Sequence, residues 1–187
     1  DHAVYMGVFL SMENPESPLS KLDIAKEVTS PDLNLRAGAY GKVKTAKNTK
    51  GGADPLIQQL SDPVIMADFW QKTIEIAQKH YEPGTFTTFT GYEWSSSPNN
   101  FNLYRNIIFK NNDNLPDLPL SSIDTEDPED LWKWMDDLRA NGATLLAIPH
   151  NGNVSDGLMF SNLTYTDKPI TRAYSEMRMR NEPLYEI

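Results

Sequence analysis

The sequence predicts an α/β fold whose parallel sheet closes into a barrel, and two observations support this prediction. Segments with strand-like composition alternate with amphipathic helices along the chain, and ionisable residues follow several of the strands. The clearest strand covers residues 143–148 and should end at Pro149, which cannot donate to a sheet ladder. His150 then stands at the carboxyl end of a buried strand, the edge at which α/β folds collect ligands and catalytic groups.

The composition is that of an ordinary globular protein and narrows the range of partners. At 187 residues, with 39% hydrophobic and 23% charged residues, the chain is predicted to form a single domain over residues 1–187. A net charge of −9 argues against nucleic acid and anionic membranes as partners, although metal ions would still allow a phosphorylated substrate. No apolar run in this sequence reaches the roughly 20 residues of a membrane span. Without cysteine, the chain has no thiolate nucleophile and no cysteine-bound zinc.

Both ends of the sequence suggest a piece of a longer protein. The chain starts at Asp1-His2 without a methionine, and residues 184–187 have the composition of a strand that is just beginning. A signal peptide could therefore have been lost, so a cytoplasmic, a periplasmic and a secreted location all stay open. The oligomeric state stays open as well.

The first third of the chain is predicted to contain a long, loop-rich excursion over residues 10–62. Several prolines interrupt this region, and only two short helices are expected, near residues 20–28 and 54–60. The basic, glycine-flanked run of residues 42–52 has no apolar periodicity, so it is interpreted as a solvated loop.

Longer helices are predicted over residues 62–81, 127–142 and 169–180. The first two begin with Asp-Pro, which supplies an N-cap and a first-turn proline, and both carry apolar residues at helical spacing. His80 falls in the last turn of the first helix, next to a lysine, and is interpreted as a surface histidine.

Further strands are predicted over residues 85–94, 101–110 and 183–187, from their β-branched and aromatic composition. Glu93 ends the first of these between a tyrosine and a tryptophan, a setting typical of a cleft wall, with a surface salt bridge as the alternative. Arg105 lies within the second strand and needs a partner, which is either a buried carboxylate or an anionic ligand.

Three residues of metal-binding type occupy comparable places in this pattern. His2 lies near the start of the chain, and Glu93 and His150 lie at strand ends. Imidazole and carboxylate together suit zinc, manganese or iron better than calcium or magnesium. If the strand ends meet at the mouth of one barrel, these side chains could share a metal site. Their spacing alone supports this only weakly, because most chains of this size carry a few such residues.

A family resemblance strengthens the metal-site hypothesis. Five ordered motifs, which together extend from the first residues to the last, resemble successive motifs of the DUF3604 family, which is itself similar to PHP-type metal-dependent phosphoesterases. They cover residues 1–7, 89–95, 104–109, 148–153 and 180–186. The resemblance implies part of a PHP-like distorted (β/α)7 barrel with parallel strands, incomplete at both ends. It also implies two or three divalent metal ions, zinc, manganese or iron, in the full-length protein.

The resemblance assigns metal-binding roles to three residues. His2 matches the histidine of the Thr-Asp-His motif, Glu93 matches a bridging glutamate, and His150 matches a later strand-end histidine. Glu93 and His150 are therefore expected to serve catalysis as well as metal binding.

Four further residues receive supporting roles. Asp1, Asn151 and Glu186 match motif positions. They are expected to contact the metal ligands without binding the ion themselves, and Asp1 would orient an imidazole. Arg105 is a hypothetical catalytic group that would bind the anionic part of a substrate.

The sequence departs from the family pattern at three points. A His-x-His motif, expected upstream of Asp1, is absent, and so is an Asp/His pair expected after Ile187. Tyr104 stands where the resemblance suggests a histidine. Because these ligands are missing, residues 1–187 alone are expected to hold metal weakly and to show little or no activity.

The implied function is metal-dependent hydrolysis of a small-molecule substrate, most simply a phosphoester. Metal ions would lower the pKa of a bound water and neutralise charge that develops on the substrate oxygen. The residue types leave two alternatives open: an amidohydrolase-like C–N hydrolase, and a catalytically inert metal-binding or structural domain.

Overall fold

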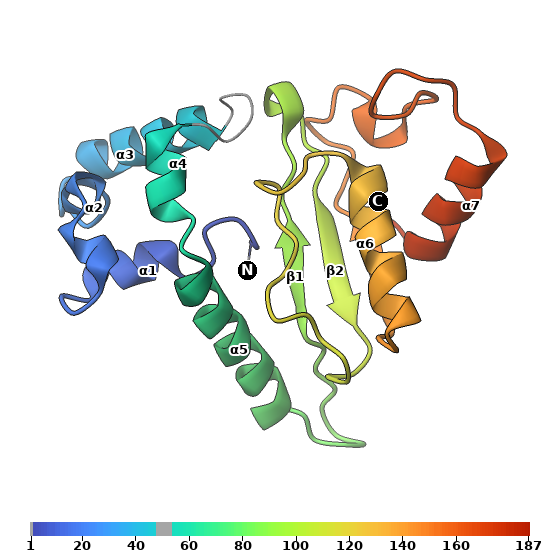
Figure 1. The fold of residues 1–187 in the computed structure, drawn as a ribbon, viewed down its shortest axis with the longest axis horizontal. Coiled ribbons are helices and arrows are strands. Elements are labelled where there is room, and N and C mark those ends of the chain that lie inside the picture. The colour runs from blue at the N-terminus through green and yellow to red at the C-terminus, as the bar shows by residue number, and fades with distance from the viewer. Residues whose placement is uncertain (1, 48–53) are drawn as a thin grey trace. The chain divides into compact units, whose positions relative to one another are not determined.

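A computed structural model describes residues 2–47 and 54–187 and divides the chain into two compact units (Figure 1). One unit is Tyr5–Trp70, and the other combines residues 2–4 with Gln71–Ile187. Asp1 and the part of the basic run at residues 48–53 lie outside the described residues. All other residues with a predicted functional role belong to the second unit.

The unit Tyr5–Trp70 is helical in its described part. Its elements are α1 (Val8–Glu13), the 3-10 helix η1 (Pro18–Lys21), α2 (Asp23–Val28), α3 (Leu33–Lys47), α4 (Pro55–Leu60) and the first half of α5 (Pro63–Lys79). The two predicted short helices are confirmed as α2 and α4.

Helix α3 was not predicted, and it includes residues that were interpreted as a loop. Its buried stripe consists only of Ala39, Val43 and Ala46, at helical spacing. Because two of these three side chains are alanine methyl groups, the stripe produces little contrast in hydrophobicity along the sequence. The apolar periodicity was therefore too weak to predict this helix.

The second unit is built on a three-stranded sheet in the order β1-β2-β3. The strands are β1 (Gly91–Trp94), β2 (Arg105–Phe109) and β3 (Leu145–Pro149), and both neighbouring pairs are antiparallel. The prediction of a parallel (β/α)7 barrel is therefore wrong. The described residues form a mixed helix and strand structure with a small antiparallel sheet.

The connections between the strands explain the correction. Residues 95–104 join β1 to β2 through only a short 3-10 helix, η3 (Pro98–Asn100), whereas a parallel crossover needs about a dozen residues or more and usually an α-helix. Asn99 and Asn100 take positive φ angles of 53° and 68°, which asparagine tolerates in a tight reversal. The chain therefore turns back on itself, and β2 runs against β1.

The longer connection from β2 to β3 contains a helix and still gives an antiparallel pair. Residues 110–127 first return to the opposite end of the sheet, where the Ser96 hydroxyl donates to the carbonyl oxygen of Glu126 at 2.8 Å. Helix α6 (Pro128–Ala140) then runs back along the sheet (Figure 1). Strand β3 therefore starts beside the end of β2, where Leu145 pairs with Phe109. There, the Lys110 amide donates to the carbonyl oxygen of Thr144 at 2.9 Å.

The two faces of the sheet differ in burial. Cross-strand partners share a face, and the rows Tyr92–Ile107–Ala147 and Trp94–Arg105–Pro149 are buried. The other face carries the half-buried rows Gly91–Ile108–Leu146 and Glu93–Asn106–Ile148. The strand-end residues with predicted functions therefore divide between the faces, with Glu93 on one and Arg105 on the other.

Helices α6 and α7 (Arg172–Asn181) pack against one another and contact β3, and the 3-10 helix η4 (Leu158–Phe160) precedes α7. The ring of Trp134 in α6 meets Tyr92 of the buried face at a centroid distance of 6.4 Å. Leu131, Trp132 and Met135 of α6 are fully buried. These contacts make one side of the sheet the core of this unit.

The remaining predicted elements are confirmed in part. Helices α5, α6 and α7 lie within or close to the predicted ranges, and β1 and β2 are the paired parts of the longer predicted strands. Residues 183–187 do not form a strand, although the Glu186 amide donates to the carbonyl oxygen of Pro149 at 3.2 Å beside β3. No helix within the described ranges is long and apolar enough to span a membrane.

The register of β2 predicts unequal effects of two neighbouring substitutions. Ile107→Ala removes a side chain from the buried face and should lower the free energy of unfolding by about 2–5 kcal/mol, because it leaves a cavity. Ile108→Ala changes the half-buried face and should cost clearly less. Urea denaturation of both variants measures this difference. Equal losses would contradict the register.

Candidate functional site

Three strand ends meet at one edge of the sheet, even though the sheet is antiparallel. Strands β1 and β3 both run against β2, so they run parallel to one another. Their carboxyl ends, at Trp94 and Pro149, therefore lie on either side of the amino end of β2 at Arg105. Glu93 and His150 come to the same edge by this route, whereas the prediction had placed them at the mouth of a barrel.

His2 and Glu93 form a close pair at this edge. The Ala3 amide donates to the backbone carbonyl of Glu93 at 2.9 Å, which holds the start of the chain beside β1. The Nδ1 atom of His2 lies 3.0 Å from Oε1 of Glu93. The buried hydroxyl of Ser95 lies 2.6 Å from the same nitrogen and 3.0 Å from the same oxygen. Three polar side chains thus converge within hydrogen-bonding distance.

The Glu93 carboxylate is held in its charged form. Burial opposes its ionisation, but hydrogen bonds from His2 and Ser95, together with the charges of His2 and His150, outweigh burial and lower the pKa of Glu93. Its side chain is 18% exposed, so the carboxylate remains accessible from solvent. An ionised, accessible carboxylate next to an imidazole can bind a cation or accept a proton.

Tyr104 lies between the two predicted histidines. Its ring centroid is 6.4 Å from that of His2 and 6.2 Å from that of His150. Burial and the nearby negative charge of Glu93 raise the pKa of Tyr104, and a hydrogen bond with Ser97 only partly offsets this. The phenol therefore keeps its proton at neutral pH and can donate a hydrogen bond within the cluster.

His150 has its own carboxylate neighbour on the other side of Tyr104. Its amide donates to the Tyr104 carbonyl at 2.9 Å, which continues the ladder beyond β3. Its Nε2 atom lies 3.8 Å from Oε2 of Glu186, and its Nδ1 atom lies 3.3 Å from the side-chain amide of Asn151. The predicted residues thus form two pairs, His2 with Glu93 and His150 with Glu186, with Tyr104 between them.

The donor set fits a metal ion only in part. Ligand atoms about 2.0–2.2 Å from one zinc ion in tetrahedral geometry lie roughly 3.3 Å from each other, and the His2–Glu93 atoms are 3.0 Å apart. A distance of 3.0 Å between the His2 nitrogen and the Glu93 oxygen is also that of an ordinary hydrogen bond, so this distance alone does not indicate a metal ion. Among the described residues, no group of three or more His, Asp or Glu side chains is placed to hold a metal ion. A complete site would need at least one further ligand.

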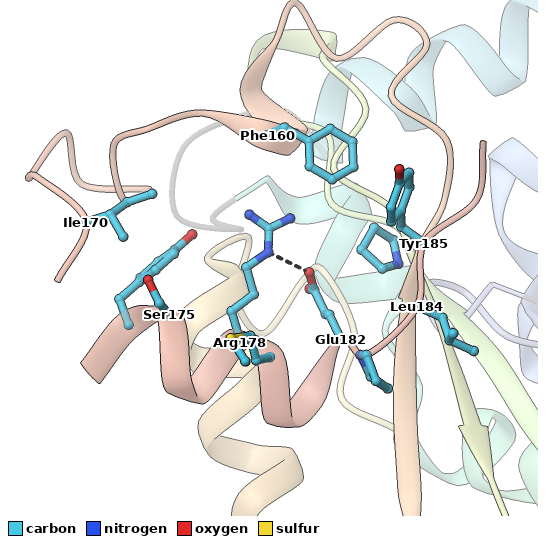
Figure 2. A pocket seen from close by; sticks show the side chains of 11 residues that line it. Phe160, Ile170, Ser175, Arg178, Glu182, Leu184 and Tyr185 are labelled. Atoms are coloured by element: carbon cyan, nitrogen blue, oxygen red, sulfur yellow. Dashed lines mark hydrogen bonds and ion pairs between the residues drawn. The ribbon is translucent and has the colours of Figure 1, made fainter. Parts of the chain in front are cut away.

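Arg105 lies on the opposite face and has a buried carboxylate partner. Its Nε donates to Oε1 of Glu182 at 3.0 Å, and the two side chains are only 2% and 1% exposed. Trp132 donates from Nε1 to the same oxygen at 2.7 Å, and Arg178 donates from Nε to Oε2 at 3.0 Å (Figure 2). Of the two partners that the sequence left open for Arg105, the structure supplies the carboxylate.

The sequence analysis did not single out Ser95 and Glu182. Ser95 follows Glu93 by two residues, and side chains two positions apart in a strand lie on the same face. This spacing could have indicated that Ser95 lies near Glu93. Glu182 follows Arg178 by four residues, a spacing that predicts an ion pair on a helix. Neither spacing indicates that Glu182 reaches Arg105, which is 77 positions away in the chain.

Taken together, the described residues define an α and β protein with a histidine–carboxylate cluster at one edge of a small antiparallel sheet. The chain belongs to the DUF3604 family, because the family model described as "Protein of unknown function (DUF3604)" matches residues 1–187. No curated protein and no solved structure matches the chain.

The His2–Glu93 contact predicts a change in proton binding. His2→Ala removes a hydrogen bond that favours the ionised carboxylate and leaves burial in place, so the pKa of Glu93 should rise. A 13C NMR titration of the Glu93 carboxyl measures this. His80→Ala, in an exposed position, is the matched control.

The same contact sets the sign of a pH effect on stability. Because the pKa of Glu93 is lower in the folded chain than in the unfolded chain, its stabilising contribution is present above the ordinary glutamate value of about 4.3. It is lost as the pH falls through the folded-state value. In His2→Ala this loss should begin at higher pH. An unchanged titration of Glu93 would show that the contact is not formed in solution.

The buried ion cluster predicts a large effect of a small change. Glu182→Gln places an amide NH2 against guanidinium donors and removes the carboxylate that pairs with both Arg105 and Arg178. We expect a loss of about 3–5 kcal/mol in the free energy of unfolding. Glu176→Gln breaks an exposed pair with Arg172 on the same helix and should cost no more than about 0.5 kcal/mol. Chemical denaturation distinguishes the two, and similar values would mean that the cluster is solvated.

Proposed function

We propose that this protein is a metal-dependent hydrolase, most simply a phosphoesterase, whose site is the cluster of His2, Glu93, Tyr104, His150 and Glu186. The observation that carries the proposal is the close pair of His2 and Glu93. An imidazole nitrogen and an ionised carboxylate oxygen lie 3.0 Å apart, and His150 is near enough to favour the charge on Glu93. The resemblance to PHP-type phosphoesterases independently favours His2, Glu93 and His150 as metal ligands.

The chemistry of the cluster supports a transition-metal ion better than calcium or magnesium. Two imidazoles contribute nitrogen, which zinc, manganese and iron accept, and two carboxylates contribute charged oxygen. His2 and Glu93 would hold one ion. His150 and Glu186, 3.8 Å apart, would contribute to the same site or to a second one. Because no group of three or more His, Asp or Glu side chains within residues 2–47 and 54–187 is placed to hold a metal ion, each pair alone is an incomplete site.

Each residue of the cluster then has a role in hydrolysis. A bound ion supplies a strongly activated water and neutralises charge on the substrate oxygen. Glu93 keeps its negative charge near neutral pH and so remains available to bind. Tyr104 keeps its proton and can donate a hydrogen bond to a developing anion between the two histidines. Asn151 would help to orient the His150 ring through Nδ1, while Nε2 faces the Glu186 carboxylate.

A phosphorylated small molecule is the proposed substrate class. The chain carries a net charge of −9, so an anionic substrate would need local positive charge, which metal ions can provide. The residue types do not by themselves distinguish a phosphoester from a C–N bond. A panel of phosphate monoesters, phosphate diesters and cyclic amides would separate a phosphoesterase from an amidohydrolase-like enzyme.

Metal content is the most direct test of the proposal. Elemental analysis of the intact, full-length protein should find zinc, manganese or iron. Glu93→Gln and His150→Ala should lower the metal affinity by about tenfold or more, and hydrolysis of the panel substrate should fall with it. His80→Ala removes an exposed histidine outside the cluster and should change neither.

Two outcomes would contradict the proposal in different ways. If Glu93→Gln binds as much metal as His80→Ala does, the cluster is not the metal site. If the protein binds metal in the cluster but hydrolyses none of the panel, the domain is a metal-binding or structural module and not a hydrolase.

A further inference from the structure

A pocket on the α7 side of the sheet has no role in the proposed hydrolysis. It has a volume of about 350 Å³, toward the small end of the roughly 300–1,000 Å³ that is usual for small-molecule sites. Figure 2 shows its side chains around the Arg178 guanidinium. They come from helix α7, the segment that follows it, the end of β3, and the residues around η4.

The wall of this pocket is mostly apolar and aromatic. Phe160 and Tyr185 stand on one side, with their ring centroids 5.5 Å apart at an interplanar angle of 69°. The other apolar members of the wall are Pro149, Ile170, Tyr174, Met179, Pro183 and Leu184. A ligand with an apolar body would therefore be desolvated favourably here.

The polar part of the pocket is an arginine that other side chains hold in place. The Arg178 guanidinium carbon lies 5.4 Å from the ring centroid of Phe160 and 5.9 Å from that of Trp132. Its Nε donates to Glu182 at 3.0 Å, and its Nη2 donates to the carbonyl oxygen of Met159 at 2.9 Å. Because its position is fixed before binding, little side-chain entropy would be lost when a ligand binds.

Arg178 also retains binding capacity. Its side chain is 20% exposed, and within the described part of the chain Nη1 has no hydrogen-bond partner. The Glu182 carboxylate is 1% exposed and accepts from Arg105, Trp132 and Arg178. Two guanidinium groups thus share the Glu182 carboxylate, and Asp127 is near enough to Arg105 to interact with its charge.

We propose that this pocket binds a small organic acid, with its carboxylate on Arg178 and its apolar body against Phe160, Leu184 and Tyr185. Arginine presents a planar fork of N–H donors that matches a carboxylate. A monoanion matches the charge of Arg178, the basic residue that lines the pocket, whereas a dianionic phosphate would leave negative charge in an apolar wall beside Glu182. The inference does not depend on the proposed hydrolase, because none of the residues that line the pocket belongs to the cluster of His2, Glu93, Tyr104, His150 and Glu186.

The test uses 3-phenylpropionate as the probe and 3-phenylpropionamide as its uncharged counterpart. Binding to the purified protein is followed by NMR, through the amide signals of Ser175 and Met179. The carboxylate should shift these signals in a saturable manner, and the amide should bind about tenfold more weakly or not at all. Phenyl phosphate should bind more weakly than the carboxylate.

Three variants locate the interaction. Arg178→Met should weaken binding of the carboxylate by about tenfold or more, whereas Arg172→Met, the same change at an exposed position of the same helix, should leave it unchanged. Because Arg178→Met also removes a partner of Glu182, it is paired with Ser175→Trp. That variant fills the pocket and leaves every charged residue of the ion cluster in place, and it should abolish binding.

The proposal is overturned if carboxylate and amide shift the same signals with equal affinity, because the charge would then play no part. It is equally overturned if Ser175→Trp binds as the unmodified protein does, or if saturable shifts do not occur at millimolar probe. Tighter binding of phenyl phosphate would reject the carboxylate in favour of a phosphate ligand. None of these outcomes affects metal binding at His2 and Glu93, which is measured separately.

Discussion

The antiparallel pairing of β2 with both of its neighbours is the constraint on which the rest of this unit depends. It brings the carboxyl ends of β1 and β3 to the same edge as the amino end of β2. It also decides which side chains share a face, because the alternation along each strand then fixes every neighbour. A slip of one residue in β2 would move Arg105 to the half-buried face and separate it from Glu182.

Charged side chains are partly exposed at one place in this unit and almost completely buried at another. At the end of the sheet, the side chains of His2, Glu93, His150 and Glu186 are partly exposed, so an incoming ligand can reach them. On the buried face, Arg105 and Glu182 are almost completely enclosed and have their hydrogen-bonding groups directed at one another. A buried charge is tolerated only when it is paired and hydrogen-bonded in this way. The partly exposed cluster can therefore bind a ligand, whereas the buried pair of Arg105 and Glu182 forms a frame that holds the surrounding elements in fixed positions.

That frame links the two proposed sites. Glu182 ends α7, receives hydrogen bonds from β2, α6 and α7, and precedes the segment that carries Tyr185 and Glu186. The position of this segment determines both the wall of the α7 pocket and the distance of Glu186 from His150. One buried carboxylate therefore positions residues on both sides of the sheet edge, although the two sites differ in ligand and in chemistry.

The sequence by itself determined the local elements that carry strong signals. Asp-Pro starts and apolar stripes predicted α5 and α6, Pro149 marked the end of β3, and the family motifs pointed to His2, Glu93 and His150. These signals are local, because caps, proline and side-chain periodicity act within a few residues. The sequence contained little indication of the side chains that contact these residues. Tyr104 entered only as a departure from the family pattern, and Ser95 and Glu182 were not singled out.

Only the tertiary structure decided how the strands run and which charges meet. The direction of β3 depends on the path of residues 110–127, which mix polar residues with scattered leucine and proline. They show no helix or strand periodicity, so we could not predict from the sequence that the chain returns across the sheet before α6. Arg105 illustrates the same limit. Its need for a partner was readable from its place in an apolar strand, but the choice of Glu182 depends on packing between residues 77 positions apart. Such contacts are set by the burial of whole faces, which no local pattern encodes.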